Sequence, residues 1–504
     1  MRELDADVAV LGSGFGGSLC ALILDRLGLR VALLDRAAHP RFAIGESSTP
    51  VADMILRDLA LRYDLPRILP LWKYGSWRAA YPDLVNGLKR GFSYFHHRPG
   101  EDFAPRADHA NELLVAASRE DALSDTHWLR ADVDAFFADE VRRAGIPFFD
   151  RTEVALRTDG RGWRLEGNRE GAPVRVRAAF VLDATGAAGA VAEALGIADE
   201  GTGLHTHSRA LFAHFTGVRR WDAMLTARGG SLADHPYPCD AAALHHVLDG
   251  AWMWVLRFGN DLVSAGLVFD ARRHPLDPGL APEDEWARWL RRYPALAEQF
   301  AAARLADPPG RFIRTGRLQR RRARAVGARW AALPHAAGFV DPLHSAGIAL
   351  TLGGVERLMR AFERHWGRSS FGPALEACER ALFAELALID GLVAACYAAM
   401  PDFRRFTAST MLYFAATIAY EQARARGEAG DRYLFCADDR RLHAIVTEAR
   451  ARLAGIGAGE AATAAYERFV EDAIAPYNTA GLFRPPAPNM YPHTAAPLPD
   501  GVRS

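Results

Sequence analysis

The sequence predicts an α/β fold in which a parallel-sheet domain carries an inserted antiparallel sheet and is followed by a helical region at the C-terminus. Residues 8–35 read as a strand, a glycine-rich turn, a helix and a second strand, which is typical of a parallel sheet. Residues 151–182 and 204–270 alternate polar and apolar side chains, as antiparallel strands do, and from residue 351 onward the chain is alanine-rich with helical periodicity. The predicted boundaries are 1–200 and 326–365 for the parallel-sheet domain, 201–325 for the inserted sheet and 366–504 for the helical cap.

The composition is that of a large globular enzyme. Half of the 504 residues are hydrophobic, and 61 basic side chains balance 61 acidic ones, so no net field gathers nucleic acid or anionic lipid. The five cysteines are scattered without the paired spacing of metal sites, and we expect reduced thiols and no metal site. The chain lacks the pattern of a secretory signal and an apolar run long enough to span a bilayer, so we expect a cytoplasmic protein without membrane or nucleic-acid partners.

The N-terminal turn has the sequence and context of a dinucleotide-binding clamp. An apolar strand at residues 8–11 runs into a GxGxxG motif, which a helix and a second strand ending in an aspartate follow. The first glycine permits the tight turn, the second lets the backbone approach the pyrophosphate, the last allows the helix to pack on the strand, and the aspartate is placed for the ribose hydroxyls. A turn that only connects two elements is the alternative. The candidate residues are Gly12, Gly14, Phe15, Gly17, Asp35 and Arg36.

Three later segments could converge on the same dinucleotide. Residues 36–50 contain GESSTP, a loop able to lay backbone amides along a planar ring unless it is an ordinary surface turn. A strand ending at residue 182 leads into the turn DATG, and GFVDPLHSAGIAL at residues 338–350 offers an aspartate for ribityl hydroxyls and helix-end amides for an anion. Simple NAD dehydrogenases seldom carry the GESSTP loop, so the pattern favours FAD. The candidate residues are Gly45, Glu46, Ser47, Ser48, Asp183, Asp341, Gly347 and Ile348.

Together, the GxGxxG start, GESSTP, DATG and GFVDPLHSAGIAL resemble the flavin-dependent halogenase family, also called tryptophan halogenase-like, over roughly residues 5–360. The resemblance implies an FAD-binding Rossmann-like fold of the glutathione reductase and p-hydroxybenzoate hydroxylase type. It also implies reduced FAD supplied by a separate flavin reductase, together with O2 and chloride or bromide. The expected substrate is an electron-rich aromatic of secondary metabolism that is phenolic, pyrrolic or tethered to a carrier protein.

Other functions remain open at this level. An FAD-dependent monooxygenase or reductase on the same fold would use the same clamp without halogenating its substrate. A catalytically idle flavin-binding protein would also retain the clamp. An NAD-dependent dehydrogenase would need a second glycine-rich or catalytic-base motif, and the sequence has neither.

The family uses a lysine away from the flavin to deliver the halogen, and Lys89 lies in the matching segment. Alternating apolar residues after it, in GFSYF, predict a strand that projects Lys89 to one face. A partly desolvated ammonium there would have a lowered pKa. The alternative is a solvated surface lysine like its neighbour Arg90.

Two tryptophans match the family's Trp-x-Trp-x-Ile-Pro strand, which keeps the substrate off the flavin. Trp252 and Trp254 stand at period two, so both should lie on one face of a strand. Leu256 and Arg257 replace the Ile-Pro pair, and this departure keeps the monooxygenase alternative open. A simple core pair of aromatic side chains is the structural alternative.

The resemblance also places a halide site and two further residues. The backbone amides of Ala346 and Gly347 match the family's anion site. His344 stands where tryptophan-specific members have a glutamate, so free tryptophan is not the expected substrate. His344 could act as an acid or base near neutral pH or be a hydrogen-bonded structural residue. Arg130 resembles the arginine that such flavoproteins bring near the cofactor, and a surface charge pair is its alternative.

Overall fold

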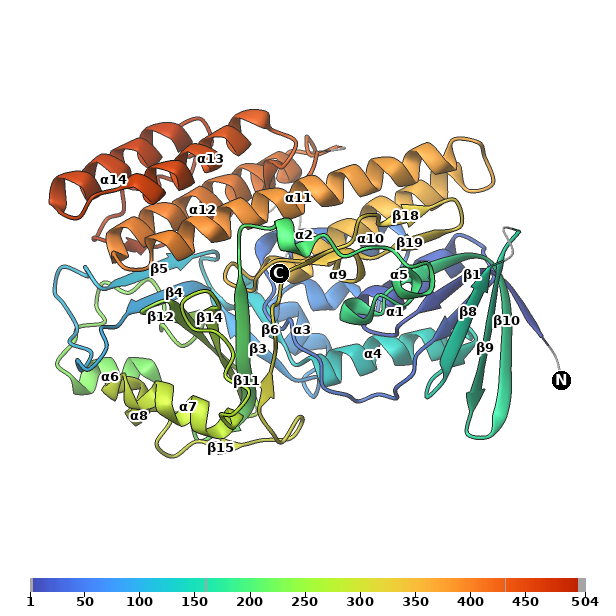
Figure 1. The fold of residues 1–504 in the computed structure, drawn as a ribbon, viewed down its shortest axis with the longest axis horizontal. Coiled ribbons are helices and arrows are strands. Elements are labelled where there is room, and N and C mark those ends of the chain that lie inside the picture. Colours follow the sequence, from blue (N-terminus) through green and yellow to red (C-terminus); the bar gives the residue numbers. More distant parts are fainter. Residues whose placement is uncertain (1–2, 159–160, 431, 497–504) are drawn as a thin grey trace.

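The computed structural model describes residues 3–158, 161–430 and 432–496, in which two sheets lie side by side beneath a layer of C-terminal helices (Figure 1). This arrangement confirms the predicted α/β fold. The first sheet contains a parallel core in the order β19, β10, β1, β2, β7, with β18 antiparallel at one edge and the β8–β9 hairpin extending β10. Its strands are β1 (Leu4–Leu11), β2 (Val31–Leu34), β7 (Phe148–Phe149), β8 (Glu153–Thr158), β9 (Trp163–Arg169), β10 (Ala172–Asp183), β18 (Val326–Gly327) and β19 (Trp330–Ala332).

Helices cover both faces of the parallel core, which explains why residues 8–11 of β1, all of β2 and residues 180–182 of β10 are continuously apolar rather than alternating. Residues 8–11 of β1 and all of β2 are buried. The shorter helices are α1 (Phe15–Arg26), α3 (Tyr74–Ala80), α4 (Arg130–Arg143), α5 (Ala190–Ala194), α6 (Trp221–Ala227), α7 (Pro282–Arg291), α8 (Pro294–Gln299) and α9 (Pro334–Ala337).

The second sheet is mostly antiparallel and extends beyond the range predicted for it. Residues 208–314 contribute most of its strands, but β4 and β5 come from residues 91–116 and β21 from the C-terminal tail. The order is β15-β11-β14-β13-β12-β4-β5-β21, and β16 also pairs with β11. The strands are β4 (Gly91–His96), β5 (Glu112–Ala116), β11 (Ser208–Thr216), β12 (Ala243–Leu248), β13 (Ala251–Arg257), β14 (Val263–Asp270), β15 (Arg304–Leu305), β16 (Ile313–Arg314) and β21 (Met490–Tyr491).

Two short ribbons complete the described β-structure. One pairs β17 (Arg320–Arg321) with β20 (Gly338–Phe339). The other pairs β3 (Asn86–Lys89) with β6 (Asp125–Trp128), so that Lys89 stands directly opposite Asp125. The prediction of one strand from Lys89 through GFSYF is therefore wrong: β3 ends at Lys89, and the residues after Arg90 form β4 in the second sheet.

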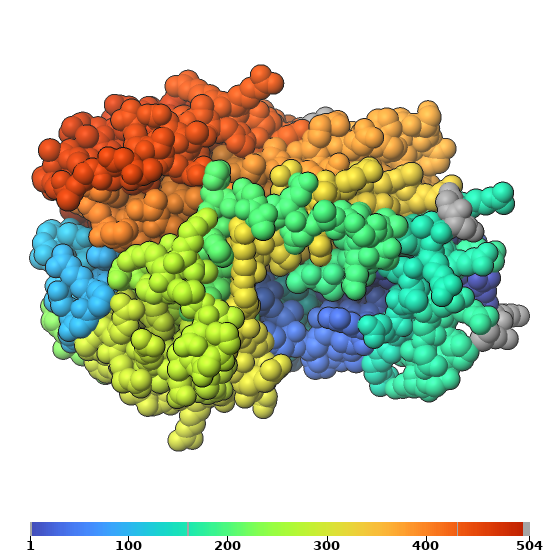
Figure 2. All heavy atoms as spheres, in the orientation of Figure 1, coloured from blue at the N-terminus to red at the C-terminus, as the bar shows by residue number. Residues whose placement is uncertain are grey.

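The C-terminal helices form a continuous layer along one side of the molecule, coloured orange to red in Figure 2. They are α10 (Ala346–His365), α11 (Phe371–Ala399), α12 (Phe403–Ala425), α13 (Arg440–Gly455) and α14 (Glu460–Ile474). Helix α11 is long and apolar enough to cross a bilayer, but 67% of its apolar window is buried within the protein. That burial is what the core helix of a globular protein shows.

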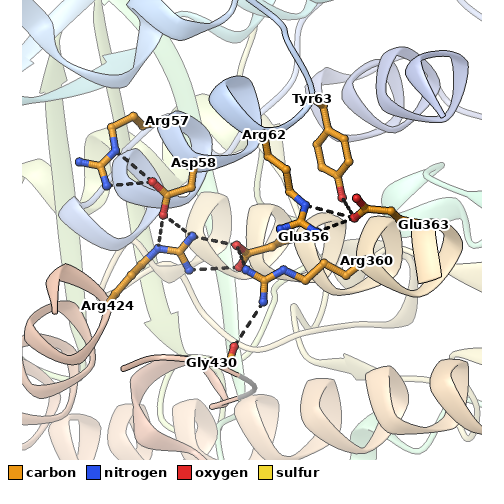
Figure 3. Close-up of polar contacts among 9 residues, drawn as sticks. All are labelled: Arg57, Asp58, Arg62, Tyr63, Glu356, Arg360, Glu363, Arg424 and Gly430. Atoms are coloured by element: carbon orange, nitrogen blue, oxygen red, sulfur yellow. Dashed lines mark hydrogen bonds and ion pairs between the residues drawn. The ribbon is translucent and has the colours of Figure 1, made fainter. Parts of the chain in front are cut away.

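An ion-pair network fastens this layer to α2 (Pro50–Arg62), as Figure 3 shows. Arg424 of α12 lies 2.7 Å from Asp58 of α2 and 2.8 Å from Glu356 of α10. Arg62 binds Glu363 at 2.8 Å. Because α2 begins at Pro50, the network also anchors the end of the GESSTP loop.

Candidate active site

The glycine-rich turn has the geometry predicted for a dinucleotide clamp. It connects β1 to α1, and Gly12 adopts a φ of 97°, which glycine reaches without strain. A Cβ atom on Gly17 would lie 2.0 Å from the carbonyl oxygen of Gly12, so the helix approaches the turn more closely than a side chain permits. Gly14 is the N-cap of α1. The turn therefore presents helix-end amides to a phosphate group.

Asp35 binds this turn. Its Oδ2 atom accepts hydrogen bonds from the backbone and the hydroxyl of Ser13, both at 2.7 Å, and from Arg41 at 3.0 Å. Its Oδ1 atom accepts from the N–H of Ala37 at 2.8 Å. Burial raises the pKa of Asp35, but Arg41 and the N–H donors outweigh it and hold the pKa below its usual value. Asp35 thus holds the turn in shape, and its contact with a ribose stays a prediction.

A cavity of about 550 Å³, here called the flavin cavity, opens in front of the clamp. It brings together residues from all the predicted segments. Those that line it are Gly14, Phe15, Gly17, Gly45, Glu46, Ser47, Arg130, Trp252, Trp254, Asp341, Ala346, Gly347 and Ile348. Gly12, Asp35, Arg36, Ser48, Asp183, Lys89 and His344 are not among its lining residues. Asp183 instead accepts hydrogen bonds from the amides of Thr185 and Val191, which stabilises the DATG turn.

Arg130 joins the clamp to the GESSTP loop. Its guanidinium binds Asp134 at 2.8 Å and donates to the carbonyl oxygens of Ile44 and Gly45 at 2.9 and 3.1 Å. It also lies 4.7 Å from the ring centroid of Phe15, whose amide donates to Asp134. The Arg130 side chain is only 11% exposed, so it is not a surface charge pair. Asp134 was not among the predicted site residues, although its position four residues after Arg130 on a helix was a usable signal.

Unpaired polar atoms along the cavity fit a flavin dinucleotide. Glu46 binds His214 through Oε1 at 2.8 Å, but its buried Oε2 atom has no hydrogen-bond partner among the described residues. The buried hydroxyl of Ser47 is likewise unpaired within that part of the chain. A flavin dinucleotide carries ring N–H groups and ribityl hydroxyls that match such acceptors and donors. His214 was not found from the sequence, because nothing local distinguishes it.

The two tryptophans lie on one face of β13, as predicted, and connect to Asp341. Their ring centroids are 6.0 Å apart, and both rings line the flavin cavity. The Trp252 indole donates to the Tyr397 hydroxyl at 3.0 Å, and that hydroxyl donates to Asp341 at 3.0 Å. Burial raises the pKa of Asp341 to about 6. Arg257, which replaces the family's proline, forms an ion pair with Asp240 at 2.6 Å and does not line the cavity.

The predicted halide site lies at the start of α10. Ala346 and Gly347 are its first residues, and their amides have no acceptor within the helix. Ser345 precedes them with a φ of 53°, a left-handed turn that directs the helix end into the cavity wall. His335 lines the cavity beside Gly347 and was not predicted from the sequence. Burial lowers the pKa of His335 to about 3, so its imidazole is neutral at physiological pH.

Lys89 is fully buried, which excludes the surface alternative. Its ammonium donates a hydrogen bond to the carbonyl oxygen of Ser48 and lies 4.2 Å from the ring centroid of Phe92. Burial lowers the pKa of Lys89 to about 8, although the carboxylates of Asp125 and Asp53 act in the opposite direction. The ammonium form of Lys89 therefore predominates at neutral pH and is lost as the pH rises through about 8.

A second, narrow cavity, here called the inner chamber, lies beside Lys89. Gly45, Glu46 and Ser47 line the flavin cavity, whereas Thr49 and Pro50 line the inner chamber. Residues 45–50, the dividing segment, thus separate the two spaces, and Lys89 binds this segment in its middle. The inner chamber is lined by Thr49, Pro50, Phe92, Val115, Ala117, Tyr413, Phe414, Thr417, Ile418, Glu421, Thr494 and Ala495.

Glu421 is the acidic side chain in the wall of the inner chamber. Burial raises its pKa to about 8, and the nearby Asp125 carboxylate adds to the rise. Buried next to Glu421 but not lining the chamber, Lys73 forms ion pairs with Asp53 at 2.9 Å and with Asp125 at 3.0 Å. No local motif in the sequence marks this group, because its members come from four distant segments.

His344 packs beneath the chamber wall. Its ring stacks on Tyr413 with centroids 4.3 Å apart, and its carbonyl oxygen accepts from the Tyr413 hydroxyl at 2.9 Å. Burial lowers its pKa to about 3, so the imidazole is neutral at physiological pH and lines neither cavity. The predicted acid or base role near neutral pH is therefore not supported, and the structural alternative fits better.

The clamp, the flavin cavity and its unpaired polar atoms define an FAD-binding oxidoreductase. Comparison with known proteins identifies the family of flavoproteins to which the chain belongs. The sequence pattern of the family described as tryptophan halogenase matches residues 125–401. The chain belongs to this family of flavin-dependent halogenases, enzymes that use reduced FAD, O2 and halide.

Individual relatives agree with that assignment. The chain is 33% identical over 359 residues to tetracycline 7-halogenase of Kitasatospora aureofaciens, covering 68% of this chain and 61% of that protein. It is 29% identical over 485 residues to monodechloroaminopyrrolnitrin halogenase PrnC of Pseudomonas fluorescens, covering 90% and 82%. A crystal structure of halogenase PltM with phloroglucinol and FAD superimposes with a TM-score of 0.82 at 26% identity, covering 94% and 97%.

Proposed function

We propose that this enzyme halogenates a small electron-rich aromatic ring, phenolic or pyrrolic, and that Lys89 delivers the halogen. The carrying observation is the hydrogen bond from the buried Lys89 ammonium to Ser48 in the dividing segment. Lys89 lines neither cavity, but this contact joins it to the segment between them, which supports a role in passing the halogen from one space to the other.

The chain's residues divide the work between the two spaces. When bound, reduced FAD with O2 and halide supplies an electrophilic halogen as hypohalous acid. The amides of Ala346 and Gly347 would hold the halide, and the clamp with Arg130 and Asp341 would hold the dinucleotide. Lys89 in its ammonium form would donate a hydrogen bond to the oxygen of hypohalous acid, which makes the halogen more electrophilic. The ring then exchanges a proton for the halogen, and water is the second product.

The inner chamber supports an aromatic substrate. Phe92, Tyr413 and Phe414 offer ring faces and edges, and Glu421 offers a hydrogen-bonding group for a phenolic oxygen or a pyrrole N–H. The chamber volume is about 20 Å³, room for little more than one water molecule, against about 550 Å³ for the flavin cavity. A ring therefore enters only when aromatic side chains of the wall move, which favours small planar substrates.

Relatives widen the choice of substrate form. One matched protein is a chlorinase of pyrrole-2-carbonyl attached to a peptidyl-carrier protein, at 21% identity over 70% of this chain. A carrier-tethered substrate is therefore a second form to test beside a free ring. We further propose a cytoplasmic enzyme that receives reduced FAD from a separate flavin reductase, since the sequence has one GxGxxG clamp.

Product analysis tests this proposal. Purified enzyme would be given chemically reduced FAD, O2, either chloride or bromide, and a panel of free and carrier-tethered phenols and pyrroles. We expect a mass shift of one halogen atom that depends on the halide supplied. Hydroxylated product formed with or without halide would overturn halogenation in favour of a monooxygenase.

A further inference from the structure

Three buried side chains far from the flavin cavity meet at one edge of the second sheet. His109 lies in the loop before β5, Glu112 is the first residue of β5, and His235 lies in the loop between α6 and β12. Their side chains are 4%, 3% and 3% exposed. One potential ligand atom from each lies within 4.8 Å of the other two.

Hydrogen bonding leaves this cluster incomplete. His109 binds Glu112 through Nδ1 and Oε1 at 2.7 Å. His235 Nε2 stands 3.3 Å from Glu112 Oε2, yet both nitrogens of His235 and this oxygen have no hydrogen-bond partner among the described residues. Buried polar atoms without partners are rare and need an explanation.

The orientation of the His235 ring relative to the Glu112 carboxylate explains why these atoms are unpaired. At 3.3 Å, the Nε2 atom of His235 is close enough to Oε2 for a hydrogen bond, but an N–H there does not point at the oxygen. Two ligands of one metal ion show this relation, because each lone pair points at the ion and not at the other ligand. Ligands at the usual zinc distances of about 2.0–2.1 Å stand about 3.3 Å apart in tetrahedral geometry.

We propose that His109 (Nδ1), Glu112 (Oε2) and His235 (Nε2) form a zinc site with water in the fourth position. Zinc would replace the proton between His109 Nδ1 and Glu112 Oε1, and that proton would leave to solvent. Two imidazoles and one carboxylate favour zinc over calcium and magnesium, which prefer oxygen ligands. Asp234 stands 3.3 Å from the other ring nitrogen of His109, Nε2. A carboxylate on the second nitrogen of a metal-binding histidine fixes its tautomer and orientation, so Asp234 completes the arrangement.

The site would link separate segments of the chain. It joins two loops of the second sheet, and the carbonyl oxygen of His109 also accepts a hydrogen bond from Asn489 at 2.9 Å. Asn489 precedes β21, whose pairing with β5 brings the C-terminal tail back to the sheet. A zinc ion here would therefore hold together a loop, a strand edge and the tail that carries Thr494 to the inner chamber.

Zinc binding by the full-length, untagged protein tests the proposal. Protein stripped with a chelator and reloaded with FAD would be titrated with zinc chloride by calorimetry, and its metal content measured by mass spectrometry. We expect one zinc ion per chain in the wild type, and a loss of binding in Glu112→Gln and His235→Gln. His274→Gln is the matched control, because His274 is a half-buried histidine outside the cluster that binds the backbone carbonyl of Asp249.

Asp234→Asn keeps the experiment decisive if the ligand variants do not fold, because the Asp234 side chain is 57% exposed. Loss of this outer contact should weaken zinc binding about 10-fold or more. Absence of zinc binding by the wild type, or binding unchanged in Asp234→Asn, would overturn the proposal. So would unchanged binding in folded Glu112→Gln and His235→Gln. A chelator should also lower the melting temperature of the wild type and leave that of Glu112→Gln unchanged.

Discussion

The flavin cavity and the inner chamber share the dividing segment but are built in opposite ways. Short motifs bring backbone amides and glycines to the wall of the flavin cavity. Side chains from β4, β5, α12 and the C-terminal tail make the wall of the inner chamber. The backbone part of the flavin cavity tolerates most changes except added bulk, whereas a wall of side chains changes with nearly every substitution. The cofactor site is thus encoded locally, and the chamber is encoded by the assembled fold.

Lys89→Met should have the largest effect and separate the two spaces. The variant keeps the stem of the side chain but removes the nitrogen that contacts the dividing segment. Product formation should fall by about 10²–10⁴-fold, the contribution of a positioned proton donor. FAD affinity and the reoxidation of reduced flavin should stay close to wild type. Wild-type product yield, measured by liquid chromatography and mass spectrometry, would remove Lys89 from the mechanism.

Gly14→Val should act on the cofactor alone. A Cβ on Gly14 meets no atom closer than 3.5 Å, so the protein itself accommodates the Cβ, whereas the added side chain would occupy the space of a bound pyrophosphate. FAD affinity should fall about 100-fold, equivalent to about 2.8 kcal/mol. Fluorescence titration measures the affinity, and circular dichroism checks that the fold is kept. Unchanged affinity would show that the clamp does not hold the dinucleotide.

Glu421→Gln should act on the substrate alone. Burial raises the pKa of Glu421 to about 8, so its carboxyl is protonated at neutral pH, and glutamine replaces the O–H donor with a weaker amide donor. KM for a phenol such as phloroglucinol should rise about 10-fold, at unchanged FAD affinity. Glu428→Gln is the matched control, because this glutamate is exposed and pairs with Arg426. A fall in kcat with unchanged KM would mean that Glu421 does not position the ring.

The pH dependence should report the Lys89 ammonium. Burial lowers the pKa of Lys89 to about 8, so the ammonium form predominates below that pH and is lost as the pH rises through it. If the ammonium donates to hypohalous acid, kcat/KM should fall above about pH 8. Since burial raises the pKa of Glu421 to about 8 as well, the profile should be repeated in Glu421→Gln. A fall that disappears in this variant would assign the titration to Glu421.

Asp35→Asn should have the smallest effect. Asparagine keeps an acceptor for the Ser13 donors and loses the ion pair with Arg41. FAD affinity should fall only about fivefold, which corresponds to the loss of one partly buried ion pair of about 1 kcal/mol. A loss equal to that of Gly14→Val would show that the carboxylate itself binds the dinucleotide.

The same contrast explains what the sequence could predict. The clamp, the GESSTP loop and the GFVDPLHSAGIAL segment are contiguous, so residue order alone indicated the cavity they line. The sequence predicted a ribose contact for Asp35. Its contacts with Ser13 and Arg41 could not be predicted, because they depend on side-chain orientation. The role of Glu421 and the burial of Lys89 depend on packing between distant segments, which no local pattern records.

The ion-pair network at Arg424 connects the elements that form the two ligand sites. Helix α12 carries Arg424 and also Tyr413 and Glu421 of the chamber wall, while α2 continues directly from the dividing segment. A substrate ring that displaces side chains of α12 would therefore also shift α2 and the dividing segment, which lines the flavin cavity. By linkage, any change in flavin affinity caused by the substrate must equal the change in substrate affinity caused by the flavin. Cooperative or competitive binding of the two ligands is thus a property that calorimetry can read in either order of addition.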